Sequence, residues 1–124
     1  MISIGKIFSF SAAHKLPHHL GQCAELHGHN YRLEVVITGE PQIVGSGPAV
    51  GMIMDFEELD AIVTESVIIP YDHRNLNDMF DNPTAEEMIE RFARDIDGNL
   101  PYGVTLSLLR LWETEKCYAE WTAD

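Results

Sequence analysis

Cysteine is scarce in this chain, and no long apolar run occurs in it. The 124 residues contain two cysteines, Cys23 and Cys117. Because two cysteines do not make a disulfide framework, we expect a reducing, cytoplasmic compartment, with a Cys23–Cys117 bridge as the alternative. No stretch of about eighteen apolar residues is present, and the first ten residues lack a basic segment and a small-residue cleavage site. We therefore expect neither a membrane span nor a signal peptide.

Basic residues are also few. Eight Lys and Arg stand against 20 Asp and Glu, which gives a formal net charge of −12. Such a field repels phosphate backbones, so we expect no nucleic-acid partner. An anionic substrate would need a local positive site, and a bound Zn²⁺ ion would be the largest local charge available. The simpler interpretation is that the acidity only keeps the protein soluble.

The length suits one domain spanning residues 1–124. Alternating and 3–4-spaced apolar residues distinguish strands from helices. They predict five strands, at 2–10, 29–38, 50–54, 104–113 and 117–121. A glycine-rich turn at 39–51 overlaps the third strand. Two helices are predicted between the third and fourth strands, one from Phe56 to before Pro70 and one from Thr84 to Gly98. Asp55 with Glu58, and Thr84 with Glu87, fit capping boxes. This order indicates an α+β fold with helices on one face of an antiparallel sheet.

Alternation also assigns residues to the two faces of each strand. In the first strand, Phe8 and Phe10 share a face. In the second, one face holds Tyr31, Leu33, Val35 and Ile37. In the strand at 104–113, alternation places Leu106, Leu108 and Trp112 opposite Leu109 and Leu111.

The segment Cys23-Ala24-Glu25-Leu26-His27-Gly28-His29 places one thiol and two imidazoles within seven residues. On an extended chain, residues i and i+2 point to the same side, so His27 and His29 can bind one cation. Because side chains alternate along a strand, both histidines are expected on the same face as Tyr31. A catalytic zinc site needs three protein ligands and an open position. His14 is the candidate third ligand, because a hairpin of the first two strands would bring it across the ladder.

Other polar residues allow two interpretations each. Asp72 could orient His73 for proton transfer, or the pair could only form a turn. Glu113 could accept two parallel N–H bonds from an amidine-like ring edge, or be a solvated strand end. His18 and His19 are expected to be exposed in a loop rather than to bind metal, and Cys117 to pack as a small hydrophobic residue.

Four segments occur together and in order: Phe10-Ser11-Ala12-Ala13-His14, Cys23-x-x-x-His27-Gly28-His29, Asp72-His73 and Glu113-Thr114. With them the chain resembles the 6-pyruvoyltetrahydropterin synthase family, and especially its 6-carboxytetrahydropterin synthase branch of the queuosine pathway. The three-residue spacing after Cys23 is similar to that branch, whereas the pyruvoyl branch usually has a longer insertion. Folate-route relatives place a glutamate in this region, and Glu25 lies nearby but not at their usual spacing.

The resemblance implies a T-fold, in which an antiparallel sheet with two helices on one face assembles into an oligomeric β-barrel, a hexamer or tetramer. It implies Zn²⁺ bound by His14, His27 and His29. It implies Cys23 as the catalytic base or proton donor, partnered by Asp72 and His73 of a neighbouring subunit. Glu113, assisted by Thr114, would anchor the pterin ring.

The substrate that the resemblance implies is 7,8-dihydroneopterin triphosphate. Lys15 and Arg74 are candidates for holding its phosphates. The implied activity is that of 6-carboxytetrahydropterin synthase, a zinc-dependent lyase. The alternatives are 6-pyruvoyltetrahydropterin synthase, a folate-route lyase, and a zinc-stabilised pterin-binding protein without activity.

Overall fold

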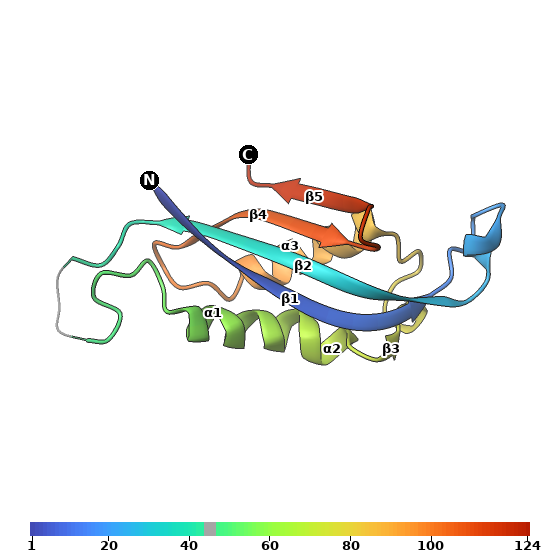
Figure 1. The fold of residues 1–124 in the computed structure, drawn as a ribbon, viewed down its shortest axis with the longest axis horizontal. Helices are drawn as coiled ribbons and strands as arrows, with labels where there is room; N and C mark the ends of the chain where they lie inside the picture. Colours follow the sequence, from blue (N-terminus) through green and yellow to red (C-terminus); the bar gives the residue numbers. More distant parts are fainter. Residues whose placement is uncertain (44–46) are drawn as a thin grey trace.

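A computed structural model describes residues 1–43 and 47–124. One five-stranded sheet has the order β3–β1–β2–β4–β5, and the helices lie on one of its faces (Figure 1). The strands are β1 (Ile2–His14), β2 (His27–Gly39), β3 (Arg74–Asn75), β4 (Thr105–Trp112) and β5 (Tyr118–Thr122). The helical segments are α1 (Phe56–Val63), the π-helical η2 (Thr64–Ile68), α2 (Ile69–Tyr71), α3 (Ala85–Asp97), and the 3₁₀ turns η1 (Gln22–Ala24) and η3 (Leu76–Asp78).

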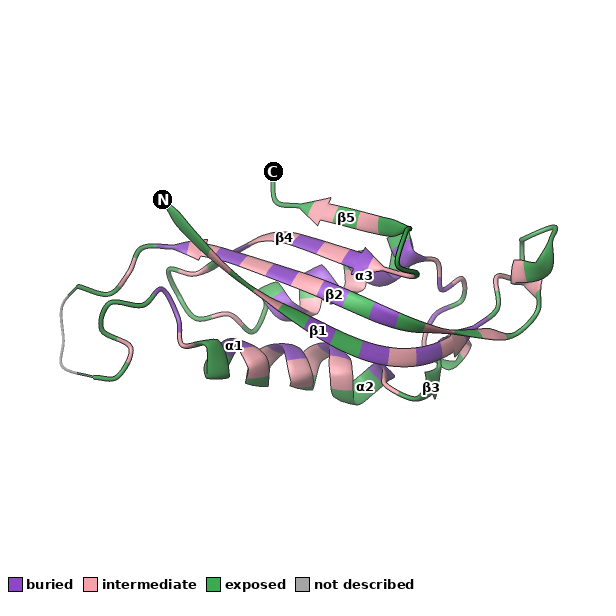
Figure 2. Cartoon of the chain, viewed as in Figure 1, coloured by how far each residue is buried: buried purple, intermediate pink, exposed green. Residues whose placement is uncertain are grey.

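Strands β1 and β2 form the long hairpin that the sequence predicts. They pair antiparallel without interruption from Ile2 opposite Gly39 to His14 opposite His27. The predicted core face of β2 is confirmed, since its four apolar side chains are at most 1% exposed: Tyr31, Leu33, Val35 and Ile37. Buried and exposed residues alternate along both strands (Figure 2). The hairpin therefore fixes which side chains at its closed end point toward the helices.

The predicted strand at 50–54 is wrong. Its residues form turns and bends, with one isolated bridge between Gln42 and Val50. Ile53 and Met54 are nevertheless buried, so the apolar run reflects packing into the core rather than a strand. Of the predicted turn at 39–51, residues 44–46 lie outside the described part of the chain.

The sheet is mixed rather than antiparallel, which corrects the predicted sheet type. The short strand β3 was not predicted, and it pairs parallel with β1 through Ala12 opposite Arg74. The two residues of β3 are both polar, so apolar alternation could not mark them as a strand. Their pairing depends on the path of the backbone after α2. This pairing places the segment after α2 along the outer edge of β1.

The predicted faces of β4 are wrong at one position. The register shifts so that Val36 pairs with Leu108 while Ile37 pairs with Leu106, which leaves Ser107 as an extra residue. The Ser107 hydroxyl donates to the Val36 carbonyl at 3.0 Å. A bulge changes the alternation by one residue, so Leu106 is buried on the same face as Leu109.

The first helical segment begins where predicted but ends later. Asp55 caps α1 by accepting a hydrogen bond from the Glu57 backbone N–H at 2.8 Å, rather than through a box with Glu58. Helical backbone continues through the π-helical η2 and into α2, which ends at Tyr71. Pro70 is the second residue of α2 and directly follows the π-helical turn, in which the Ile69 N–H donates to the Thr64 carbonyl. The predicted stop before Pro70 is therefore wrong.

The second predicted helix, α3, is confirmed at both ends. The Thr84 hydroxyl accepts from the Glu87 N–H at 3.2 Å, and Gly98 is the C-cap. One face of α3 is buried, which packs the helix on the sheet: Met88, Ile89, Phe92, Ala93 and Ile96. Among the described residues, no helix is long and apolar enough to cross a bilayer.

Candidate metal centre

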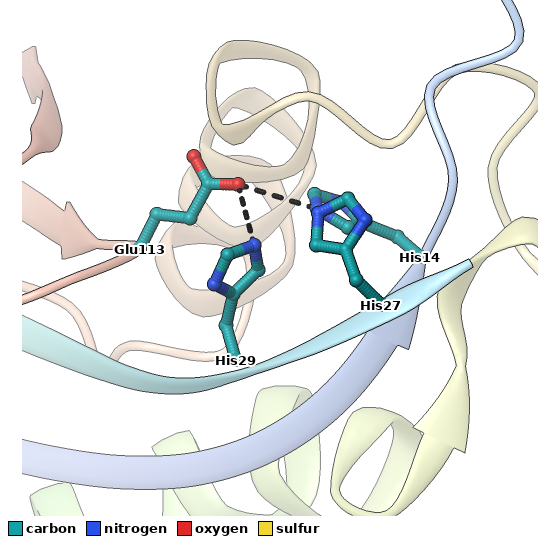
Figure 3. Close-up of side chains that lie close together, drawn as sticks. All are labelled: His14, His27, His29 and Glu113. Carbon is teal, nitrogen blue, oxygen red and sulfur yellow. Dashed lines mark hydrogen bonds and ion pairs between the residues drawn. The ribbon is translucent and has the colours of Figure 1, made fainter. Parts of the chain in front are cut away.

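Three histidines and one glutamate converge at the closed end of the β1–β2 hairpin. His14 is the last residue of β1, and it lies directly opposite His27, the first residue of β2. His29 follows two residues later on the same face, and Glu113 comes directly after β4. One side-chain donor atom from each residue lies within 4.8 Å of all the others (Figure 3). The predicted histidine trio is therefore brought together, and Glu113 joins it.

The spacing of these atoms is close to that of metal ligands. His14 Nε2 lies 3.0 Å from His27 Nε2. Glu113 Oε1 lies 3.2 Å from His14 Nε2 and 3.0 Å from His29 Nε2. Zinc bonds of about 2.0–2.1 Å in a tetrahedron place neighbouring ligand atoms about 3.3–3.4 Å apart. Small side-chain movements would therefore place all four atoms around one ion.

Hydrogen bonds on the far sides of two rings fix their tautomers. His14 Nδ1 donates to the Pro83 carbonyl at 2.8 Å, and His27 Nδ1 donates to the Glu25 carbonyl at 2.7 Å. A carbonyl oxygen only accepts, so a neutral ring held this way presents its lone pair at Nε2. His29 Nε2 is buried and has no hydrogen-bond partner among the described residues, although Glu113 lies beside it. Facing lone pairs repel unless a proton or a metal ion lies between them, and three imidazole nitrogens beside a carboxylate oxygen are a ligand set that fits zinc.

Burial and the carboxylate act in opposite directions on the imidazoles. Burial lowers the pKa of His14, but hydrogen bonds with Glu113 and with the Pro83 carbonyl outweigh it, so the pKa is raised. Burial lowers the pKa of His29 despite the nearby Glu113 charge. The hydrogen bond with His14 lowers the pKa of Glu113. The carboxylate of Glu113 therefore favours a positive charge among these imidazoles.

Cys23 lies close along the chain but outside this ligand group. It is part of η1, in the arm that connects β1 to β2, and its side chain is half-buried. The Leu16 N–H donates to the Cys23 carbonyl at 2.8 Å, which closes the base of the arm just beyond His14. The group of metal-ligating atoms does not include the Cys23 thiol. His18 and His19 are exposed in the same arm, as predicted.

Asp72 and His73 form the predicted pair, but at the outer edge of β1. Asp72 Oδ2 lies 3.0 Å from His73 Nδ1, and Oδ1 accepts from the Ser11 N–H at 2.9 Å. The Ser11 bond, followed by the His73 bond, lowers the pKa of Asp72. The His73 side chain is 82% exposed and its φ is +60°. Within one chain, the structure does not bring His73 into the group of metal-ligating atoms.

The turn after β4 presents Glu113 to a small cavity. The Glu113 N–H donates to the Cys117 carbonyl at 3.0 Å, and both residues line a cavity of about 300 Å³ with Tyr118 and Ala119. Thr114 is exposed, and its hydroxyl accepts from the Lys116 N–H. Cys117 is also exposed, so the prediction that it packs as a hydrophobic residue is wrong. Both cysteines are free, which excludes a Cys23–Cys117 bridge within the chain.

Sequence reasoning missed two groups that support His14. One is the Pro83 carbonyl, and the other is the buried Tyr31 hydroxyl, 3.4 Å from His14 Nδ1. A backbone carbonyl has no sequence signature of its own. The only signal was the predicted helix start at Pro83-Thr84, because the residue before a helix can turn its carbonyl toward the sheet. For Tyr31 the signal was the alternation of side chains along β2, which assigns it to the same face as His27 and His29.

Comparisons with known proteins show the family and the fold of the chain. Residues 3–124 match the family model described as 6-pyruvoyl tetrahydropterin synthase. The chain is 42% identical over 105 residues to the dihydroneopterin monophosphate aldolase of Pyrococcus furiosus, covering 85% of this chain and 83% of that protein. It is 33% identical over 141 aligned positions to the 6-carboxy-5,6,7,8-tetrahydropterin synthase of Haemophilus influenzae, covering 98% and 99%. The structure of Caenorhabditis elegans 6-pyruvoyl tetrahydropterin synthase has the same fold, with a TM-score of 0.81, 24% identity, and coverage of 99% and 96%.

Proposed function

The chain belongs to the 6-pyruvoyl tetrahydropterin synthase family, and from that premise we propose that it is a zinc-dependent 6-carboxytetrahydropterin synthase. It converts 7,8-dihydroneopterin triphosphate to 6-carboxytetrahydropterin, acetaldehyde and triphosphate, a step toward queuosine or another 7-deazapurine. The observation that carries the proposal is the convergence of His14, His27 and His29 beside an arm that carries a thiol. The relative from Haemophilus influenzae that bears this name matches over nearly its whole length.

Each site residue has a role that suits its position. Zinc held by His14, His27 and His29 would acidify the side-chain hydroxyls of the substrate and the adjacent C–H groups. Cys23, outside the ligand group, acts as the base that removes a proton. Glu113, assisted by Thr114, holds the amino and N–H edge of the ring through charge-assisted hydrogen bonds.

Proton transfer on the other side of the substrate is the role of His73, with Asp72 holding its orientation. The His73 ring is mostly exposed and lies outside the ligand group of its own chain. We therefore place it at the site of a neighbouring subunit, in a homo-oligomer that is a hexamer or tetramer. This arrangement accounts for a formed Asp72–His73 pair that has no substrate site within its own chain.

A second candidate is an aldolase that acts on dihydroneopterin monophosphate. The relative from Pyrococcus furiosus with that name is 42% identical. In the described part of the chain, three basic side chains have no ion pair or side-chain hydrogen bond, and all three lie near the histidine end in sequence or pairing: Lys15, Arg74 and Lys116. These side chains are candidates for holding the phosphate of either substrate.

The two candidates differ in their products. We would incubate the zinc-loaded protein separately with each phosphorylated dihydroneopterin and identify products by mass spectrometry. The first candidate predicts 6-carboxytetrahydropterin and acetaldehyde from the triphosphate. Aldol cleavage would instead release a hydroxymethyl pterin and a two-carbon aldehyde phosphate, and a pyruvoyl product would indicate the third family activity. Pterin binding without turnover of either substrate would contradict both and favour a binding protein.

A further inference from the structure

Glu113 contacts two histidines with the same carboxylate that, in the proposed function, holds the ring edge. Its Oε1 contacts both His14 Nε2 and His29 Nε2, at 3.2 and 3.0 Å. In Figure 3 the other carboxylate oxygen points away from the histidines. In the described part of the chain, Oε2 has no hydrogen bond or ion pair. One half of the carboxylate is therefore at the metal position, and the other half is free.

A ring edge with an amino group beside an N–H needs both carboxylate oxygens, because the two donors are parallel and adjacent. Oε1 cannot accept such a bond at full strength while it also completes the ligand group. Holding a metal ion and holding the ring are therefore alternative states of the same side chain. In the structure the carboxylate is turned toward the imidazoles of His14 and His29.

The surroundings of Glu113 allow it to change partners. Its backbone is fixed by the bond from its N–H to the Cys117 carbonyl at 3.0 Å. Its side chain is 28% exposed, and its contacts are with the imidazoles. The cavity of about 300 Å³ that it lines lies on the side of β5 and the α3 start. Rotation of the side chain alone can thus move the carboxylate from the histidines into the cavity.

We propose that Glu113 is the fourth ligand of the resting metal centre and leaves it when the substrate ring binds. This inference rests on the proposed function, because it takes the ring to be the incoming group. The carboxylate then closes the metal position until a ring is in place. Binding of the remote ring thereby opens the position that the side-chain hydroxyls occupy, which limits access of water in the resting protein.

Metal affinity tests the first half of the proposal. Glu113→Gln removes the anionic ligand and nearly preserves the shape of the side chain. We expect zinc to bind this variant at least about tenfold more weakly than wild type in a chelator competition, since even groups that only orient a ligand contribute 10–100-fold. Glu86→Gln is the matched control, because Glu86 lines the same cavity and has no contact with a histidine. Unchanged affinity in Glu113→Gln would overturn the proposal.

The exchange itself is tested with cobalt in place of zinc. The probe is 6-methylpterin, which has the ring edge but no side-chain hydroxyl to bind a metal. We expect it to change the visible absorption of the cobalt-loaded wild-type protein, as the carboxylate leaves, and to leave the spectrum of Glu113→Gln unchanged. Ring binding, followed by fluorescence quenching, with an unaltered wild-type spectrum would overturn the exchange.

The same measurements separate this inference from the proposed function. If fluorescence quenching shows no binding of 6-methylpterin while Glu113→Gln weakens zinc binding, then the proposed pterin-converting function and the exchange are both wrong. If the ring binds and turnover is normal but the spectrum does not respond, the function stands and only the exchange is wrong.

Discussion

Replacing His14 with phenylalanine separates the packing of this buried ring from its binding of metal. The His14 side chain is 1% exposed, and its ring contacts those of His27, His29 and Tyr31. A phenyl ring of similar size preserves most of this packing. It removes the hydrogen bond to the Pro83 carbonyl and the Nε2 lone pair.

The two losses have different magnitudes. In metal-free protein, we expect His14→Phe to lower the free energy of unfolding by about 1–3 kcal/mol, because the buried carbonyl loses its partner. With free zinc at 100 times its dissociation constant, wild type gains about 2.7 kcal/mol, and the variant gains little because it lacks one imidazole ligand. The difference between the two proteins should therefore increase to about 4–6 kcal/mol when zinc is present.

Urea unfolding with zinc or with a chelator, at one fixed protein concentration, measures both values. His18→Phe is the matched control, because that histidine is exposed in the arm, and it should respond to zinc as wild type does. If zinc stabilised His14→Phe as much as wild type, His14 would not be a ligand and the interpretation of the site would be refuted.

Three other predictions concern activity and pH. Cys23→Ala should lower kcat by about 10²–10⁴-fold, the usual contribution of general acid–base catalysis, while zinc affinity stays unchanged; parallel loss of zinc would show that the thiol is a ligand. The Ser11 N–H lowers the pKa of Asp72, so the stabilisation that this carboxylate provides is present above its unfolded pKa of about 3.9 and is lost as pH falls through the lower folded value. The difference in urea midpoint between wild type and Asp72→Asn should therefore disappear in strong acid, and a constant difference would contradict this cause. Lys15→Met should raise KM for the phosphorylated substrate by about 10–100-fold, as loss of one charged hydrogen bond predicts, whereas the same change at the ion-paired Lys6 should leave KM unaltered.

The histidine trio could be predicted because strand parity is a local property. Side chains alternate along an extended backbone, so His27 and His29 had to share the Tyr31 face once β2 was assigned. The hairpin register then brought His14 opposite His27. Apolar alternation likewise predicted the buried face of β2, and the 3–4 spacing of apolar residues predicted the buried face of α3.

What depended on distant contacts could not be predicted. The bulge at Ser107 is one inserted residue that apolar patterning does not mark, so Leu106 was assigned to the wrong face. The strand β3 is two polar residues long, and its pairing follows from where α2 ends. The contact of Glu113 with His14 requires β4 to lie beside β2, and no local sequence pattern predicts that pairing.

The zinc environment itself tests the central claim most directly. We would measure zinc stoichiometry and X-ray absorption at the zinc edge on the purified, zinc-loaded protein without substrate. The account predicts one zinc ion per chain, with only nitrogen and oxygen ligands at about 2.0–2.1 Å. A sulfur ligand at about 2.3 Å would contradict it, because Cys23 would then be bound to the metal rather than free to act as a base. A protein that binds no zinc would contradict it as well.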